Sequence, residues 1–175
     1  MNIGIHSVSS QSGGAYLVDM ITQDHAVYGY ARTSQHGVDF VERVNRRGGV
    51  DLVRPEDNLN KEVSRFIPFR NCQIGHKLKD LVDQSDLIII AHPSQYLLTT
   101  IKGLKKAGII KKRVPIVLSP PRTFAVPYLW NELGAGYPFV SFATCPYSCK
   151  APKPGTVFIK RRKRNWIASL EGSFT

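Results

Sequence analysis

The sequence lacks a long apolar run and a leader-like N-terminus. No stretch of the 175 residues approaches the ~20 apolar residues that a membrane-spanning helix needs. The first residues also lack the charged and then apolar pattern of a signal peptide. We therefore expect a soluble, cytoplasmic protein with no membrane partner.

Cysteine is also scarce. The chain has three cysteines, Cys72, Cys145 and Cys149, an odd number with no pair of C-x-x-C sites. This pattern indicates neither a disulfide framework nor a structural zinc site. It is most typical of a protein from a reducing compartment. We predict no metal site, and the sequence shows no internal repeat or low-complexity tract.

Acidic residues are few in the second half of the chain. Residues 100–175 contain fourteen Lys and Arg but two Asp and Glu, a net charge of +12, whereas residues 1–99 contain ten and eleven, a net charge of −1. Such asymmetry fits nucleic acid, an anionic cofactor or an acidic surface as a partner. The basic run 160–164 has no interleaved aromatic residues, so we interpret it as the solvated end of a hairpin, and nucleic acid is the weaker alternative.

The N-terminal segment has the pattern of half a nucleotide-binding βαβ unit. The expected elements are a strand at 2–6, a helix at 13–21 with Leu17, Val18 and Ile21 on one face, and a strand at 26–31,. A mononucleotide-binding fold begins in this way.

The turn after the first strand lacks the usual glycines. In the fingerprint Gly-x-Gly-x-x-Gly the glycines allow a tight turn, close approach to a pyrophosphate and close helix packing. Here the three positions are Ser7, Ser9 and Ser12. Serine is small and offers hydroxyl groups to phosphate, but it does not reach positive φ as freely as glycine. Two interpretations stay open: a phosphate-binding turn, or a plain turn whose helix is capped by Ser10 or Ser12.

The end of the second strand favours a phosphorylated cofactor. An acidic residue there holds the ribose of NAD, whereas Arg suits the 2′-phosphate of NADP. This chain has Arg32, Thr33 and Ser34, with no acidic residue between Asp24 and Asp39. The pattern predicts NADP(H) in preference to NAD(H). The alternative is an ordinary exposed arginine after a strand.

The remaining chain alternates helices and strands. We expect helices at 36–47 and 77–83. A third helix should follow Ser94, which would cap it, and a fourth should lie around 127–133. Tyr96 and Trp130 are expected among the buried residues of these last two helices. Strands are expected at 86–91, 114–118, 137–142 and 155–159,. The region 50–76 is the least readable, and in it 51–54 and 65–69 could be short strands separated by turns. This order predicts an α/β, Rossmann-like, doubly wound and mostly parallel sheet with helices on both faces, in one dinucleotide-binding domain over residues 1–175.

Three late segments carry a resemblance to a known family. They are Val117-Leu-Ser-Pro-Pro-Arg-Thr123, Ser141-Phe-Ala-Thr-Cys-Pro-Tyr-Ser-Cys-Lys150 and Pro154-Gly-Thr-Val-Phe-Ile159. In sequence and spacing they resemble the N-terminal cofactor domain of opine dehydrogenases, the octopine and nopaline dehydrogenase family with its opine-metallophore relatives. Two positions depart from that pattern: Pro121 stands where the family has glycine, and Ser141 where many members have Glu.

The resemblance implies reductive condensation of an amino acid with an α-keto acid, using NAD(P)H. It places these residues at the cofactor: Ser7, Ser9, Ser10, Gln11 and Ser12 at the pyrophosphate, Arg32, Thr33 and Ser34 at the 2′-phosphate, and His92, Pro93, Ser119 and Pro120 along the crevice. It also places Thr144, Pro146 and Tyr147 near the nicotinamide or substrate.

The resemblance also implies a second, helical domain with the catalytic histidine. None of the five histidines here matches it, so we assign no catalytic residue. His92 follows a strand and is expected to be a hydrogen-bonded neighbour rather than an acid. We expect either a fragment of such an enzyme or a non-catalytic Rossmann-like binding module, and an apolar sheet face that could support a homodimer.

Overall fold

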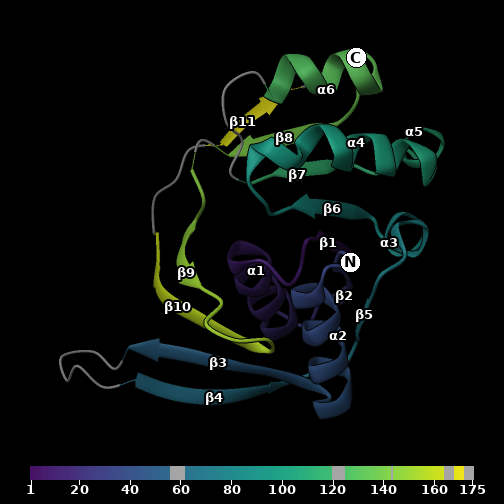
Figure 1. Ribbon diagram of the computed structural model, residues 1–175. Helices are drawn as coiled ribbons and strands as arrows, with labels where there is room; N and C mark the ends of the chain where they lie inside the picture. Colours follow the sequence, from purple (N-terminus) through teal and green to yellow (C-terminus); the bar gives the residue numbers. More distant parts are fainter. Residues whose placement is uncertain (56–61, 120–124, 143, 164–167, 172–175) are drawn as a thin grey trace.

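The computed structural model describes residues 1–55, 62–119, 125–142, 144–163 and 168–171. Its main sheet has seven strands in the order β11-β8-β7-β6-β1-β2-β5 (Figure 1). All neighbours pair in parallel except β11 with β8. The strands are β1 (Asn2–His6), β2 (Ala26–Tyr30), β5 (Cys72–Gly75), β6 (Leu87–Ile90), β7 (Ile116–Leu118), β8 (Phe139–Phe142) and β11 (Ala168–Glu171). The predicted fold class, a Rossmann-like doubly wound sheet, is confirmed.

Helices cover both faces of this sheet. They are α1 (Gln11–Thr22), α2 (Gln35–Arg47), α3 (Leu78–Gln84), α4 (Leu97–Lys106), α5 (Ile109–Lys112) and α6 (Ala125–Leu133), with a short 3-10 turn at Ser94–Tyr96. Because side chains alternate along a strand, Ile89 of β6 belongs to the buried cluster that includes residues of α1 and α2, whereas Ile88 and Ile90 belong to the cluster that includes residues of α3 to α6. This two-sided burial explains the continuous apolar run of β6.

The strand order reverses direction at β1. The chain moves from β1 to β2 and β5 on one side, and then returns to β6, β7 and β8 on the other. In open α/β sheets, ligands bind beyond the carboxyl ends of the strands at such a point. The ends of β1 and β6 therefore mark the place to look for a site.

A second sheet packs against the outer side of α1, and the sequence pattern does not predict it. Its order is β4-β3-β10-β9, with strands β3 (Gly49–Pro55), β4 (Glu62–Pro68), β9 (Tyr147–Lys150) and β10 (Thr156–Arg162). A Cβ on Gly14 of α1 would lie 2.8 Å from Val157 Cγ2 of β10, so this glycine allows the close contact between helix and sheet. Asp19 of α1 pairs with Arg162 of β10 through both carboxylate oxygens.

Several sequence-based expectations need correction. The expected strand 155–159 belongs to the second sheet and not to the main one. Ser94 opens the 3-10 turn without capping a helix, and Tyr96 and Trp130 are each 37% exposed. Tyr96 lies where the turn meets α4 and so projects out of the helix packing. In the basic run, Arg162 is not simply solvated, because it pairs with Asp19.

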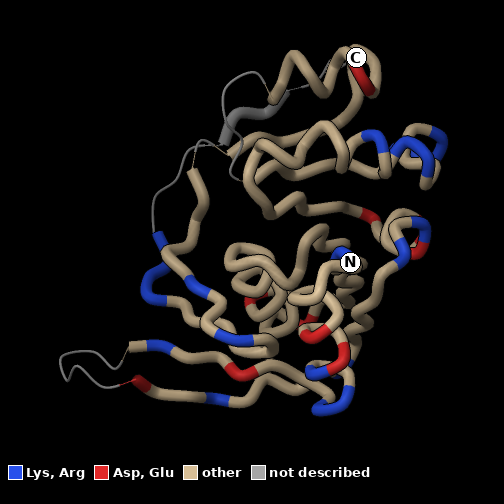
Figure 2. Tube along the Cα trace, viewed as in Figure 1, with Lys and Arg blue, Asp and Glu red and all other residues tan. Residues whose placement is uncertain are grey.

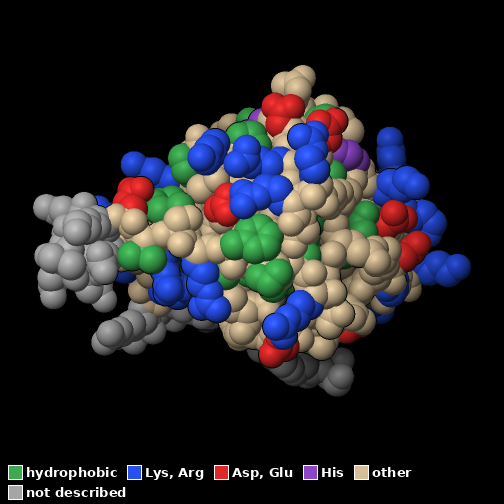
Figure 3. All heavy atoms as spheres, turned by 90° about the horizontal axis from the view of Figure 1, so that it is seen from below, with side chains coloured by type: hydrophobic (Ala, Val, Ile, Leu, Met, Phe, Trp, Pro, Cys, Tyr) green, Lys and Arg blue, Asp and Glu red, His purple; other side chains and the backbone are tan. Residues whose placement is uncertain are grey.

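The basic residues of the second half of the chain form separate groups. One group lies on α4 and α5 (Lys105, Lys106, Lys111, Lys112) and another on β10 (Lys160, Arg161, Arg162), far apart in Figure 2. The underside, where α2 and β3-β4 lie, likewise shows Lys and Arg interrupted by acidic and apolar side chains (Figure 3). Among the described residues, no helix is long and apolar enough to cross a bilayer.

Candidate functional site

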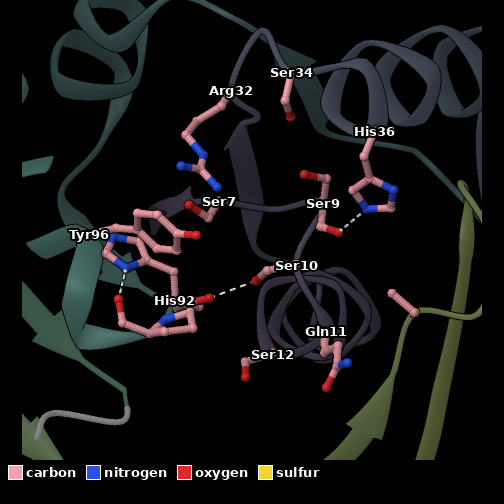
Figure 4. Close-up of a pocket in the computed structure, with 13 residues that line it drawn as sticks. Ser7, Ser9, Ser10, Gln11, Ser12, Arg32, Ser34, His36, His92 and Tyr96 are labelled. Atoms are coloured by element: carbon pink, nitrogen blue, oxygen red, sulfur yellow. Dashed lines mark hydrogen bonds between the residues drawn. The ribbon is translucent and has the colours of Figure 1, made fainter. Parts of the chain in front are cut away.

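A cavity of about 540 Å³ opens beyond the carboxyl ends of β1, β2 and β6, at the reversal point of the sheet. Figure 4 shows side chains from the β1–α1 turn, the start of α2 and the segment after β6 arranged around it. The described lining residues are Ser7, Ser9, Ser10, Gln11, Ser12, Arg32, Ser34, His36, Ala91, His92, Pro93, Tyr96 and Ala151. Nine of the twelve residues predicted at the cofactor lie on this one cavity. Whether they bind a cofactor stays a prediction.

The turn after β1 has glycine-like geometry although it contains serine. Ser7 has φ of +63°, the left-handed conformation that glycine adopts most easily. Its Oγ lies 3.0 Å from Nδ1 of His6, and its carbonyl accepts a hydrogen bond from the amide of Ser10 at 2.9 Å. The turn therefore takes the tight bend that the first glycine of the fingerprint usually permits.

Ser10 and Gly13 fix the start of α1. Ser10 is the N-cap, and its Oγ accepts from the Gly13 amide at 3.0 Å while donating to the Ala91 carbonyl at 2.6 Å. A Cβ on Gly13 would lie 2.2 Å from the Ser7 carbonyl oxygen. Close packing of the helix against the turn thus depends on Gly13, one position after Ser12, which occupies the third glycine position of the fingerprint. Of the two residues considered as a cap, Ser10 has this role.

The N-terminus of α1 points at the cavity. In an α-helix the first amide groups have no partner within the helix, and together with the helix dipole they favour a bound anion. Gln11 and Ser12 stand in this first turn and line the cavity. The hydroxyl groups of Ser9 and Ser12 add further hydrogen-bonding capacity (Figure 4).

Arg32 lies on the opposite wall of the cavity. Its guanidinium stacks over the ring of Tyr96, with Cζ 4.4 Å from the ring centroid, a cation–π arrangement that orients the charge. Ser34 is the N-cap of α2 and accepts from the Gly37 amide at 3.4 Å. His36 Nε2 lies 2.9 Å from the Ser9 carbonyl oxygen. The contact of His36 joins the first turn of α2 to the β1–α1 turn.

Two buried imidazoles, His6 at the end of β1 and His92 after β6, lie with their ring centroids 5.1 Å apart, and of the two His92 lines the cavity. His6 is 2% exposed, and burial, with the nearby His92 and Arg32, lowers its pKa well below the ordinary value. Burial also lowers the pKa of His92, whose ring nitrogens lie 2.8 Å from the Pro93 carbonyl and 2.9 Å from Thr100 Oγ1. The expectation that His92 is a hydrogen-bonded neighbour is therefore confirmed.

Some predicted site residues lie outside the cavity. Thr33 is exposed and does not line it, and Ser119 is buried, accepting a hydrogen bond from Tyr16 at 2.6 Å. Pro120 lies outside the described residues. Thr144 accepts a hydrogen bond from Lys163 at 3.1 Å. Tyr147 packs edge-on against Tyr16 at 4.9 Å and, with Pro146, borders a separate groove on the α1 side of the sheet.

Four lining residues were not predicted: His36, Ala91, Tyr96 and Ala151. The position of His36, four residues after Arg32 in the first turn of α2, is a signal that could have identified it. Tyr96 was assigned to a buried helix face, and Ala151 reaches the cavity only because β9 and β10 fold back. No cluster of His, Cys, Asp and Glu suited to a metal ion occurs in the part of the chain that the structure describes.

No protein-family model matches the sequence, and no curated protein matches it significantly. Solved structures do match. Octopine dehydrogenase in complex with NADH and agmatine is 14% identical, with a TM-score of 0.79 over 100% of this chain and 43% of that one. Yersinopine dehydrogenase with NADP+ bound is 14% identical, with a TM-score of 0.72 over 97% of this chain and 40% of that one. A ketopantoate reductase from Ralstonia eutropha is 14% identical, with a TM-score of 0.63 over 93% and 47%.

These similarities concern the fold. The resemblance to opine dehydrogenases predicted from the sequence is confirmed at that level, since the two opine-type enzymes have the higher TM-scores of the three. The chain spans less than half the length of each of these proteins.

Proposed function

We propose that the cavity binds NADP(H) and that the chain is the nucleotide-binding part of an opine dehydrogenase-like oxidoreductase. One observation carries the proposal: a left-handed turn at Ser7 leads into the N-terminus of α1 while Arg32 faces the same cavity from the end of β2. NADP(H) has a pyrophosphate that suits the first place and an adenosine 2′-phosphate that suits the second. The structural relatives support a nicotinamide cofactor, because octopine dehydrogenase is solved with NADH and yersinopine dehydrogenase with NADP+.

The residues present fit the pyrophosphate. Tight packing at Gly13 holds the helix terminus against the turn, so the amide groups of Gln11 and Ser12 are fixed beside the cavity. Where the usual fingerprint has glycines, the serine hydroxyl groups of this turn can donate hydrogen bonds to phosphate oxygens. A pocket of several hundred Å³ is also the usual size for a small-molecule cofactor site.

The residues also fit a 2′-phosphate better than a bare ribose. Arg32 is the one Lys or Arg among the described lining residues, and no Asp or Glu is among them. A carboxylate at this position would accept hydrogen bonds from the ribose hydroxyl groups of NAD and would repel a phosphate. The guanidinium and the Ser34 hydroxyl offer charge-assisted and neutral hydrogen bonds to phosphate oxygens.

Calorimetry with an Arg32→Ala variant tests the proposal. We expect NADPH affinity to fall about ten- to hundredfold, since hydrogen bonds to charged groups contribute about 1.5–3 kcal/mol, while NADH affinity hardly changes. The matched control is Arg65→Ala, an exposed arginine of β4 outside the cavity, which should leave both affinities unchanged. Equal losses for both nucleotides would contradict the phosphate contact, and no affinity for either would favour a non-catalytic binding module.

The reaction is part of the same proposal. A bound nicotinamide would supply hydride to the imine formed from an amino acid and an α-keto acid. The described residues of this chain would bind and orient the nucleotide, and His92, whose pKa is lowered by burial, would keep its side of the cavity uncharged. Because His92 is engaged at both ring nitrogens, we assign no proton transfer to it.

A further inference from the structure

The ring of Tyr96 contacts both the guanidinium of Arg32 and the imidazole of His92 (Figure 4). The Arg32 Cζ lies 4.4 Å from the centroid of the Tyr96 ring. The rings of His92 and Tyr96 meet edge to face, with their centroids 6.1 Å apart and an angle of 78° between their planes. The His92 ring is itself held by the Pro93 carbonyl oxygen and by Thr100 Oγ1. A charge at the edge of the cavity is thus supported, through one aromatic ring, by a fixed side chain.

Core packing does not account for the position of Tyr96. Its side chain is 37% exposed, and in the described part of the chain it belongs to neither buried cluster. It ends the 3-10 turn after β6, whereas Arg32 follows β2, so two segments far apart in the sequence supply the two halves of the stack. Both side chains line the cavity, which places the stack at the proposed nucleotide site.

The stack limits the freedom of an arginine that is otherwise unrestrained. Arg32 is exposed, and among the described residues it forms no ion pair with a carboxylate. Ordering a long side chain when a ligand binds costs free energy. An aromatic ring that holds the guanidinium beforehand reduces this cost. Because stacking uses a face of the planar guanidinium, the N–H groups along its edge remain available to phosphate oxygens.

We propose that Tyr96 is a positioning residue, which strengthens the preference for NADPH over NADH by holding Arg32 toward the adenosine 2′-phosphate. This inference rests on the proposed function, because it requires NADP(H) to occupy the cavity. Tyr96 acts through the guanidinium and not by contact with the nucleotide. NADH has a hydroxyl group in place of the 2′-phosphate, so its affinity should depend little on where the guanidinium lies.

Calorimetry of the full chain with NADPH and with NADH tests this role. Tyr96→Leu removes the ring and should weaken NADPH binding about two- to fivefold, the size of an exposed cation–π interaction, while NADH affinity stays unchanged. Tyr96→Phe and Tyr96→Trp keep a ring and should retain the preference for NADPH. In a chain that already carries Arg32→Ala, Tyr96→Leu should cause no further loss, because the group that it positions is gone.

Phe66→Leu in β4 is the matched control. Phe66 is 39% exposed, and the Arg47 Cζ lies 5.1 Å from its ring centroid, so this variant also removes an exposed ring from beside a guanidinium. Neither residue is among those that line the cavity. The affinities for NADPH and NADH should therefore both stay unchanged.

Three results would overturn the inference while the unmodified chain still binds NADPH. They are an unchanged NADPH affinity in Tyr96→Leu, equal losses for both nucleotides, and a further loss in the Arg32→Ala chain, which would mean that Tyr96 acts without Arg32. Failure of the proposed function looks different, since the unmodified chain would then bind neither nucleotide, and the inference would fall with it. Circular dichroism of each variant establishes that it is folded.

Discussion

Small residues determine the geometry of the β1–α1 turn. Ser7 accepts a left-handed conformation that usually costs a non-glycine residue about 1–2 kcal/mol, and its hydrogen-bond contact with His6 offsets part of this cost. Gly13 leaves room for the Ser7 carbonyl oxygen. The missing glycines in the sequence therefore did not mean a missing turn, because a serine can take the bend when a neighbour holds its hydroxyl.

Gly13→Ala should destabilise the protein by about 1–3 kcal/mol, because its Cβ would meet backbone that cannot move away. Gly103→Ala in α4 is the matched control. Its Cβ would meet the end of the flexible Leu78 side chain, at 2.8 Å, and alanine also favours the helix. Urea unfolding measures both free energies, and equal changes would contradict the role given to Gly13.

The buried histidines predict a loss of stability in acid. The pKa of His6 is lowered in the folded protein, whereas in the unfolded chain it is about 6.5. Below about pH 6.5 the unfolded state therefore binds more protons, so the free energy of unfolding falls as the pH falls toward the folded pKa. Above about pH 6.5 the His6 side chain adds no pH dependence to the free energy of unfolding. In His6→Gln the decrease of the free energy of unfolding with falling pH should become smaller. In His25→Gln, which changes a histidine away from His6 and His92, this decrease should persist. An unchanged slope in His6→Gln would contradict the assignment.

At the scale of elements, α1 is held between two sheets. Asp19 and Arg162 join it to β10, and Gly14 allows the contact. A double-mutant cycle with Asp19→Asn and Arg162→Ala should give a coupling free energy of about 1 kcal/mol, a modest value because the Arg162 side chain is 41% exposed. The exposed pair Lys79–Asp83, one turn apart within α3, should give less than about 0.5 kcal/mol. Equal coupling in the two cycles would show that the pair between α1 and β10 has no special role.

The elements of the main sheet could be predicted because their signals are local. The apolar run of β6 and the glycine-terminated helix α2 are visible in a few residues each. The second sheet could not be predicted in this way. Its strand β9 is four residues long, and β3 pairs with β10 across about a hundred residues of sequence, a contact that no local pattern encodes. For the same reason Ala151 was missed at the site.

At the scale of the molecule, three of the four segments that line the cavity meet because the parallel strands β1, β2 and β6 end at one edge of the main sheet. The sequence identified most of their residues, since each of these three segments follows a recognisable strand, whereas Ala151 lies between β9 and β10 of the second sheet. It misplaced Tyr147 and Ser119, because it could not show that their side chains turn toward α1 rather than the cavity. The fold thus explains which of the predicted residues lie together on the cavity and which do not.

The most direct test of nucleotide binding is an NMR titration of the labelled chain with NADPH. The account predicts that the backbone amide signals of Ser9, Gln11 and Ser12 and the side-chain signal of Arg32 shift together, saturating at one ligand per chain. Signals of the β3–β4 hairpin should stay unchanged. Shifts confined to residues outside the cavity, or no shifts at saturating NADPH, would contradict the account.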